Sequence, residues 1–314
     1  MAMELEKIYR YAISALDTIL FSRIFALCER LGFHITRNHF YQPIPDTGTL
    51  KDPLWLRQSQ LVGININEQK QVEMINQFLR FKNEYDNFPG NRTAKPWQFH
   101  TGNPHFGPVD AEVLYCMIRH FQPKKIIEIG SGYSTYLSAE AILKNEGESR
   151  HRADLIAIEP HPNRVLKSGF PGLSRLIPKK LEAVDSEEFK TLNENDILFI
   201  DSSHVLKIGS DVYHEYLEIL PGLNAGVIIH IHDIFFPYEY PKRWVLKMRR
   251  FWNEQYLVQA FLAFNNAFEV LWCGSYMHLK HPDKLAEAFA SYNQVTVWST
   301  SRPGATSLWI RKIA

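Results

Sequence analysis

Apolar residues in the first third of the chain recur at helical spacing in two stretches. Residues 5–31 predict one or two amphipathic helices, and residues 68–83 predict another. Residues 87–108 are rich in Pro, Gly, Asn and Thr, which indicates a boundary between two parts of the chain. We therefore expect a helical N-terminal region over residues 1–107 and a main domain over residues 108–314.

The pattern changes at the start of the main domain. Asp110 is typical of a helix N-cap, and the apolar stripe behind it predicts a helix that packs on a sheet and ends at Pro123. From Lys125 onward, short β-branched runs alternate with helical patterns, which indicates βαβ units and a parallel sheet in an α/β fold. The seven expected strands are Ile126–Ile129, Leu155–Glu159, Leu176–Ile177, Ile197–Ile200, Val227–Ile231, Phe268–Leu271 and Ser307–Ile310. No helical pattern follows the last two, so the final strand can insert antiparallel, as mixed sheets allow.

Composition and charge exclude several classes of protein. The 314 residues carry 35 Lys and Arg against 34 Asp and Glu, so no global field attracts nucleic acid, an anionic membrane or acidic substrates. The 3 cysteines are too few and too scattered for a disulfide framework or a paired-cysteine zinc site. The N-terminus lacks a secretory signal, and no apolar stretch approaches the ~20 residues that span a bilayer. We expect a cytoplasmic protein whose partner is a small molecule. The sequence leaves open whether the protein forms a homo-oligomer.

The first expected strand leads into Gly130-Ser131-Gly132 and then into a helical run from Thr135. Glycines let the backbone turn sharply and approach a ligand closely, and a helix start offers free N–H groups. By itself this pattern also fits an ordinary tight turn with Ser134 or Thr135 as the helix N-cap. A dinucleotide-binding loop would place a third glycine where Thr135 stands, so the turn favours a different ligand.

Two acids flank this turn at the ends of neighbouring expected strands. Glu128 could hold a cationic amino-acid group, or it could accept backbone N–H groups of the turn. Glu159 ends the second strand, where such folds place a carboxylate against two ribose hydroxyls, although a surface glutamate before Pro160 is the plainer alternative. After the third strand, Glu182 and Ala183 are expected near an adenine.

Imidazoles and carboxylates follow the fourth and fifth expected strands. The fourth delivers Asp201 and His204 to the carboxyl edge of the sheet, and the fifth delivers His232 and Asp233 to the same edge. Such a cluster can bind a metal or transfer a proton, and His204 is the candidate general base. His230, inside the strand, is expected to be a packing residue. The plainer alternatives are that Asp233 caps a turn and that His204 donates to a nearby carbonyl.

Together these motifs resemble the class I S-adenosylmethionine-dependent methyltransferases, over about residues 106–310. The chain is most similar to an uncharacterised bacterial group with Glu-Ile-Gly-Ser-Gly-Tyr-Ser-Thr and Asp-Ser-Ser-His segments. The resemblance implies a Rossmann-like seven-stranded sheet with its last strand antiparallel and an N-terminal helical cap over the substrate. The cofactor ligands that it implies are Glu128, Gly130, Ser131, Gly132, Ser134, Glu159, Pro160, Glu182, Ala183 and Asp201.

A related branch, the metal-dependent sugar O-methyltransferases of macrolide pathways, is similar around Asp201, His204 and Asp233. In that branch the acids hold magnesium and the histidine deprotonates a sugar hydroxyl. The resemblance implies a divalent metal held by Asp201, His232 and Asp233. His232 stands where that branch has an acid, and one imidazole with two carboxylates suits manganese, iron or zinc better than magnesium.

The function that these observations favour is S-adenosylmethionine-dependent O-methylation of a small acceptor, such as a sugar or a secondary metabolite. His204 would be the base, Asp201 would assist it, and the aromatic residues 235–241 would form a substrate wall. Three alternatives stay open. They are an NAD-dependent oxidoreductase on a related fold, a non-haem iron enzyme that uses His230, His232 and an acid, and a binding protein without catalysis.

Overall fold

The computed structural model describes residues 19–149, 152–294 and 305–314. The chain divides into two compact units, Met1–Asp52 and Pro53–Ala314. In the first unit, residues 19–30 are helical, which confirms part of the first predicted helix; residues 5–18 of that prediction lie outside the described residues. No helix among the described residues has the length and apolar character needed to cross a membrane.

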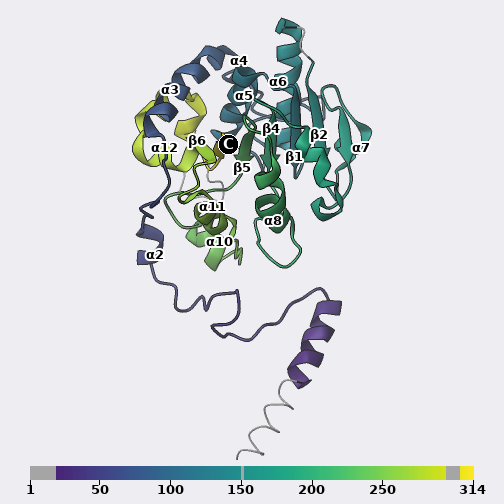
Figure 1. Ribbon diagram of the computed structural model, residues 1–314, viewed down its shortest axis with the longest axis vertical. Coiled ribbons are helices and arrows are strands. Elements are labelled where there is room, and N and C mark those ends of the chain that lie inside the picture. Colours follow the sequence, from purple (N-terminus) through teal and green to yellow (C-terminus); the bar gives the residue numbers. More distant parts are fainter. Residues whose placement is uncertain (1–18, 150–151, 295–304) are drawn as a thin grey trace, which may run out of the picture. The chain divides into compact units, whose positions relative to one another are not determined.

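A seven-stranded sheet forms the centre of the second unit, in the order β3-β2-β1-β4-β5-β7-β6 (Figure 1). Its strands are β1 (Lys125–Ile129), β2 (Asp154–Ile158), β3 (Arg175–Ile177), β4 (Ile197–Ile200), β5 (Ile228–Ile231), β6 (Phe268–Cys273) and β7 (Leu308–Lys312). Strands β1 to β5 pair in parallel, and β7 runs antiparallel to both β5 and β6. The α/β fold, the seven strands and the antiparallel last strand are therefore confirmed.

The central strands lack polar alternation because both faces of the sheet are covered. Alternate residues of β4, such as Phe199 and Ile200, belong to two different hydrophobic clusters. On one face lie α5 (Asp110–Phe121) and α6 (Tyr133–Ser149), and on the other lie η4 (Glu215–Ile219) and α11 (Glu254–Leu262). This arrangement brings the carboxyl ends of β1, β2, β4 and β5 to one edge of the sheet.

The remaining helices are mostly short. They are α2 (Pro53–Leu56), α3 (Glu68–Phe78), η1 (Leu79–Phe81), α4 (Lys82–Tyr85), α7 (Arg164–Ser168), η2 (Leu181–Ala183), η3 (Ser186–Thr191), α8 (Asp211–His214), α9 (Leu220–Gly222), α10 (Lys242–Leu246), α12 (Gly274–Lys280), α13 (Pro282–Ala288) and η5 (Ala290–Gln294). The helix predicted over residues 68–83 is present as α3, η1 and the start of α4.

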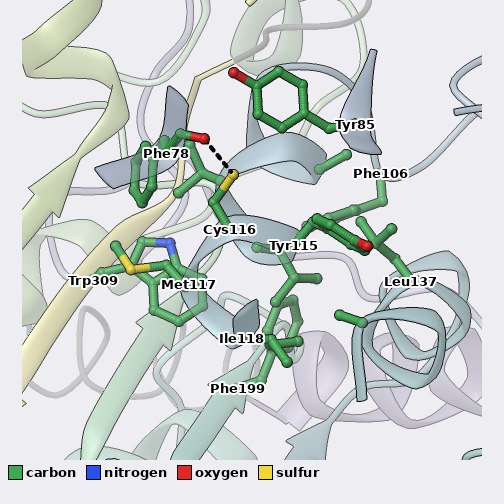
Figure 2. Packing of buried hydrophobic residues seen from close by; sticks show 14 of the residues in the cluster. Phe78, Tyr85, Phe106, Tyr115, Cys116, Met117, Ile118, Leu137, Phe199 and Trp309 are labelled. Carbon is green, nitrogen blue, oxygen red and sulfur yellow. Dashed lines mark hydrogen bonds between the residues drawn. The ribbon is translucent and has the colours of Figure 1, made fainter. Parts of the chain in front are cut away.

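Residues before the predicted boundary contribute to the core around α5. Phe78, Tyr85 and Phe106 are buried in the same cluster as Met117, and the Cys116 thiol donates to the Phe78 carbonyl at 3.8 Å (Figure 2). The unit that contains the sheet thus begins at Pro53. That the N-terminal region covers the substrate stays a prediction.

The helix-capping role predicted for Asp110 is wrong. Val109 occupies the N-cap position of α5 and makes no side-chain cap bond. The Asp110 carboxylate instead accepts three hydrogen bonds from the two residues before β7. The N–H and the hydroxyl of Thr306 donate at 2.9 and 3.0 Å, and the N–H of Ser307 donates at 2.9 Å. A buried carboxylate needs several donors, and this distant backbone supplies them.

Candidate active site

The turn between β1 and α6 is fixed by its close approach to β4. Gly130 has φ of +79°, and a Cβ atom there would lie 1.9 Å from the carbonyl oxygen of Asp201. The N–H of Gly130 donates to Ile158 at 3.0 Å, and the N–H of Asp201 donates to Ile129 at 2.9 Å. Only glycine fits such a position without displacing backbone.

Gly132 differs from Gly130, although both belong to the same motif. A Cβ atom at Gly132 would meet no other atom within 4 Å. Its N–H donates to the Thr135 hydroxyl at 2.9 Å, so this turn is closed by a side chain of α6. Space beside Gly132 is therefore open, whereas Gly130 is needed for the fold itself.

Glu128 is fully buried at the end of β1. The Ser134 hydroxyl donates to its Oε1 at 2.5 Å, and its Oε2 has no hydrogen-bond partner among the described residues. Burial raises the pKa of Glu128 to about 8, against the opposite effect of the Ser134 and Thr135 hydroxyls. A buried carboxylate with an unused oxygen is suited to a cation, because a positive charge would remove the cost of ionising it.

Glu159 follows β2 and reaches the same turn. Its Oε2 accepts from the N–H of Ser131 at 3.2 Å and its Oε1 accepts from the N–H of His161 at 2.7 Å, and the residue is half-buried. The carboxylate therefore lies against the turn and does not point into bulk solvent. Since a carboxylate has more lone pairs than these two bonds use, further donors can still bind it.

The other predicted cofactor ligands differ in exposure. Ser131 Oγ is buried and has no hydrogen-bond partner in the described part of the chain. Pro160 is exposed directly after Glu159, and Glu182 and Ala183 are exposed in η2. Their roles toward a cofactor stay predictions.

Three carboxylates surround the imidazole of His204. Its Nε2 lies 3.2 Å from Asp201 Oδ1 and 3.9 Å from Asp233 Oδ2, and its Nδ1 lies 2.8 Å from Glu254 Oε2. His204 is buried and has a left-handed backbone with φ of +59°. The loops after β4 and β5 thus meet, as the sequence predicts, and α11 adds a third acid.

The pKa values of His204 and Asp201 shift in opposite directions. Burial lowers the pKa of His204, but the Asp201 and Glu254 carboxylates outweigh it and hold this pKa well above its usual value. Burial would raise the pKa of Asp201, but the imidazoles of His232 and His204 lower it to about 2. The arrangement therefore stabilises an imidazolium between carboxylates.

The two histidines of β5 and its loop have different environments. His230 is fully buried and stacks on Phe199 with ring centroids 3.9 Å apart, and burial lowers its pKa well below the usual value. This confirms the expected packing role. His232 Nε2 lies 3.8 Å from Asp233 Oδ1, and Asp233 and Asp201 raise the pKa of His232 against the opposite effect of burial.

The predicted metal ligands do not converge as a metal site. Within residues 19–149, 152–294 and 305–314, no three or more His, Cys, Asp and Glu side chains are arranged to hold a metal ion. Between the carboxylates of Asp201 and Asp233 lies Nε2 of His204, so the imidazole ring occupies the space that a shared metal ion would need. As arranged, Asp201, His232 and Asp233 do not fit a bound metal.

The aromatic segment expected to be a substrate wall is largely core. Phe235 and Tyr240 are buried and pack with Trp244 in a separate hydrophobic cluster. The half-buried Trp252 lies nearer the chemistry, because its ring packs on the His204 imidazole with centroids 4.2 Å apart. The sequence shows many aromatic residues in this region, but it does not distinguish those that line a pocket from those that are buried in the core.

Sequence reasoning missed Glu254, Tyr216 and Phe106. The Tyr216 hydroxyl donates to Glu254 Oε1 at 2.7 Å, and the Phe106 ring lies 5.1 Å from that of His232. Glu254 is 50 positions from His204 and stands in no motif. The available signal was a charged residue at the start of an apolar helix, which is usually an exposed position.

Residues 127–234 match a family described as a methyltransferase domain, over roughly a third of the chain. The match begins in β1 and ends in the loop after β5, so it contains the glycine turn, Asp201, His204 and Asp233 but not Glu254. The sheet order and its antiparallel strand agree with it. This part of the chain is therefore similar to a methyltransferase domain, which agrees with the resemblance that the motifs indicate.

Individual proteins that resemble the chain have low sequence identity to it. An uncharacterized protein of Archaeoglobus fulgidus is 24% identical over 200 residues, which cover 62% of this chain and 89% of that protein. An O-methyltransferase from Bacillus cereus, solved with S-adenosylhomocysteine, is 10% identical over 77% of this chain and 91% of its own, with a TM-score of 0.35. A putative protein-L-isoaspartate O-methyltransferase from Plasmodium falciparum is 18% identical over 53% and 77%, with a TM-score of 0.29.

Proposed function

We propose that this chain transfers a methyl group from S-adenosylmethionine to a hydroxyl oxygen of a small acceptor. The observation that carries the proposal is the buried Glu128 carboxylate with an unused oxygen at the point where the strand order reverses between β1 and β4. Open α/β sheets bind their ligands at this point. The match of residues 127–234 to a methyltransferase domain supports the choice of cofactor.

The residues around the turn fit the chemistry of this cofactor. Glu128 would hold its cationic amino-acid part, because the unused oxygen is buried and offset by no cation among the described residues. Glu159 would accept hydrogen bonds from the ribose hydroxyls. The open space beside Gly132 would admit the part of the cofactor that joins its amino-acid group to its ribose. Bound S-adenosylmethionine supplies an electrophilic methyl group.

His204 would take the proton of the acceptor. Nε2 of His204 would accept the proton of the acceptor hydroxyl as the oxygen of that hydroxyl takes the methyl group. Only the neutral imidazole has the lone pair for this transfer, so turnover would require a pH at which His204 has lost the proton on Nε2, and the raised pKa of His204 moves that pH upward. Asp201 and Glu254, which raise the pKa of His204, stabilise the imidazolium that results.

Two measurements test the proposal. Isothermal titration calorimetry with S-adenosylhomocysteine and with NAD should give binding of the first alone, and Glu128→Gln should weaken it about tenfold or more, since a charge-paired contact is lost. Transfer of a labelled methyl group to a panel of sugars, phenols and small alcohols should then identify an oxygen acceptor. Binding of NAD in place of S-adenosylhomocysteine would favour the oxidoreductase, and transfer only to amines or thiols would contradict O-methylation.

A further inference from the structure

The buried side chain of Glu254 makes specific contacts to one nitrogen of His204. Its carboxylate uses both oxygens, because Oε2 lies 2.8 Å from His204 Nδ1 and Oε1 accepts from the Tyr216 hydroxyl at 2.7 Å. The side chain is 1% exposed, so water does not compete for these positions. Since a carboxylate only accepts, the proton on this side of the imidazole belongs to Nδ1.

The start of α11 also holds the backbone of His204. The N–H groups of Asn253 and Glu254 donate to the His204 carbonyl at 3.2 and 3.3 Å. The Asn253 side chain accepts from the N–H of Leu206 at 2.6 Å. These bonds fix a residue whose φ of +59° is costly for a side chain larger than glycine. His204 is thus held by hydrogen bonds at both its backbone and its ring, and together these bonds fix the position of Nε2.

From this geometry we infer that Glu254 is a positioning residue that keeps the Nδ1–H tautomer of His204, leaves the Nε2 lone pair for the acceptor hydroxyl, and is itself oriented by Tyr216. The inference rests on the proposed base role of His204. Both ring nitrogens face carboxylates, but the nearer one is Glu254, at 2.8 Å from Nδ1 against 3.2 Å for Asp201 from Nε2. When the imidazolium gives up one proton, the proton that remains is the one on Nδ1, and the electron pair is left on Nε2.

Tyr216 determines what an amide in this position would do. In Glu254→Gln, the Tyr216 hydroxyl still requires an oxygen acceptor, so the amide oxygen faces Tyr216 and the NH₂ group faces Nδ1. That orientation forces the proton onto Nε2 and removes the base. In the double variant Glu254→Gln with Tyr216→Phe, the amide is free to rotate, and its oxygen can accept from Nδ1–H again.

The tautomer is measured directly, without turnover. Long-range ¹H–¹⁵N spectra of histidine-labelled full-length protein, with His204 assigned by His204→Asn, are recorded over a pH series and compared where the His204 ring has lost one proton. There the wild type should keep its single ring proton on Nδ1. We expect Glu254→Gln to move the proton to Nε2 and the double variant to move it back. An unchanged His204 tautomer in Glu254→Gln, or no return in the double variant, would overturn the inference.

Glu215→Gln is the matched control, since Glu215 is a second buried carboxylate of the same cluster. Its Oε2 accepts from the Ser202 hydroxyl at 3.1 Å, and it makes no hydrogen bond to His204. Burial raises the pKa of Glu215 well above its usual value, so the neutral amide resembles its ordinary state. We expect the His204 signals to stay as in the wild type, and a shift of the tautomer here would contradict a specific role for Glu254.

Kinetics with an identified acceptor separate positioning from folding. Glu254→Gln should lower kcat about 10²-fold or more with KM changed little, because the tautomer is needed in the transition state rather than for binding. Where this variant is poorly folded, Glu254→Asp keeps the charge, and its kcat should still fall because the shorter side chain draws back from Nδ1. A kcat equal to that of the wild type overturns the inference. If His204→Ala retains turnover while the tautomer changes as expected, the base role fails and the positioning contact stands.

Discussion

The two halves of the candidate site are held by contacts of different range. In the β1–α6 turn, Glu128 bonds to Ser134 only six positions away, and Gly130 lies against the backbone of the neighbouring strand. His204, in contrast, is held by Glu254, 50 positions away. The first half is therefore set by a short segment and the strand order, and the second depends on packing of a separate helix. Substitutions in the first half should change folding and cofactor affinity, whereas those in the second should change turnover.

The largest expected effect is that of His204→Ala on turnover. Removal of the proposed base should lower kcat by about 10² to 10⁴-fold, because proton removal then falls to water. Affinity for S-adenosylhomocysteine should stay within about twofold, since the cofactor half is separate. Steady-state kinetics and calorimetry measure the two quantities, and loss of both together would show that the halves are not independent.

The second prediction compares the two glycines of one turn. Gly130→Ala should destabilise the protein by more than about 3 kcal/mol, because the new methyl group meets the Asp201 carbonyl and the backbone has positive φ. Gly132→Ala should cost less than about 1 kcal/mol, since its Cβ meets nothing within 4 Å. Urea unfolding of both variants checks this, and equal losses would argue against the described approach of the turn to β4.

A third prediction concerns the pH dependence of cofactor binding. The pKa of Glu128 is raised by burial to about 8, so the free protein carries a proton there at neutral pH. A bound cation favours the carboxylate, and the affinity for S-adenosylhomocysteine should rise with pH up to about 8 and then level off. The cofactor amine titrates as well, so Glu128→Gln is the reference. The pH slopes of wild type and variant should differ, and identical slopes in calorimetry would contradict the pairing.

The same raised pKa has a consequence for stability without cofactor. Between the usual pKa of a glutamate and about 8, the folded protein binds a proton at Glu128 that the unfolded chain does not. Stability should therefore fall as pH rises through this window, and Glu128→Gln should remove that component. Urea unfolding at several pH values measures it. A wild-type stability that rises across the window relative to the variant would have the wrong sign.

The smallest expected effect is that of Trp252→Leu. The indole packs on the His204 ring, and the Arg250 guanidinium lies 5.0 Å from the centre of the same indole. Loss of this contact should lower kcat about threefold to tenfold, which corresponds to the usual strength of such aromatic contacts. Tyr256→Leu, which changes an exposed aromatic residue of α11, is the control. A larger loss in the control would indicate damage to α11 rather than to the His204 contact.

Much of the fold and part of the site could be predicted from local pattern. Uninterrupted apolar runs place the strands within about two residues of their observed ends, because a parallel sheet is buried on both faces. The convergence of Asp201, His204 and Asp233 follows from the strand order. The distinction between His230 and His232 was partly predictable, since only the first lies inside the strand β5.

Other features had no local signal. Asp110 was predicted to cap α5, but its donors come from Thr306 and Ser307 at the far end of the chain. The aromatic residues 235–241 have the composition of a pocket wall, and only packing with Trp244 shows that most of them are core. Burial depends on neighbours that are remote in sequence, and a pattern of residue types does not contain them.

The sequence by itself determined the seven strands, the antiparallel last strand and the glycine turn, because each follows from backbone sterics and the burial of short segments. Tertiary structure alone decided that Glu254, itself bonded by Tyr216, contacts the far side of the His204 ring, that the His204 imidazole lies between Asp201 and Asp233, and that residues 53–107 share the core of the sheet. These features depend on which helices pack together. Packing by shape and burial joins residues that are far apart in the sequence, and the periodicity of apolar residues does not show which ones.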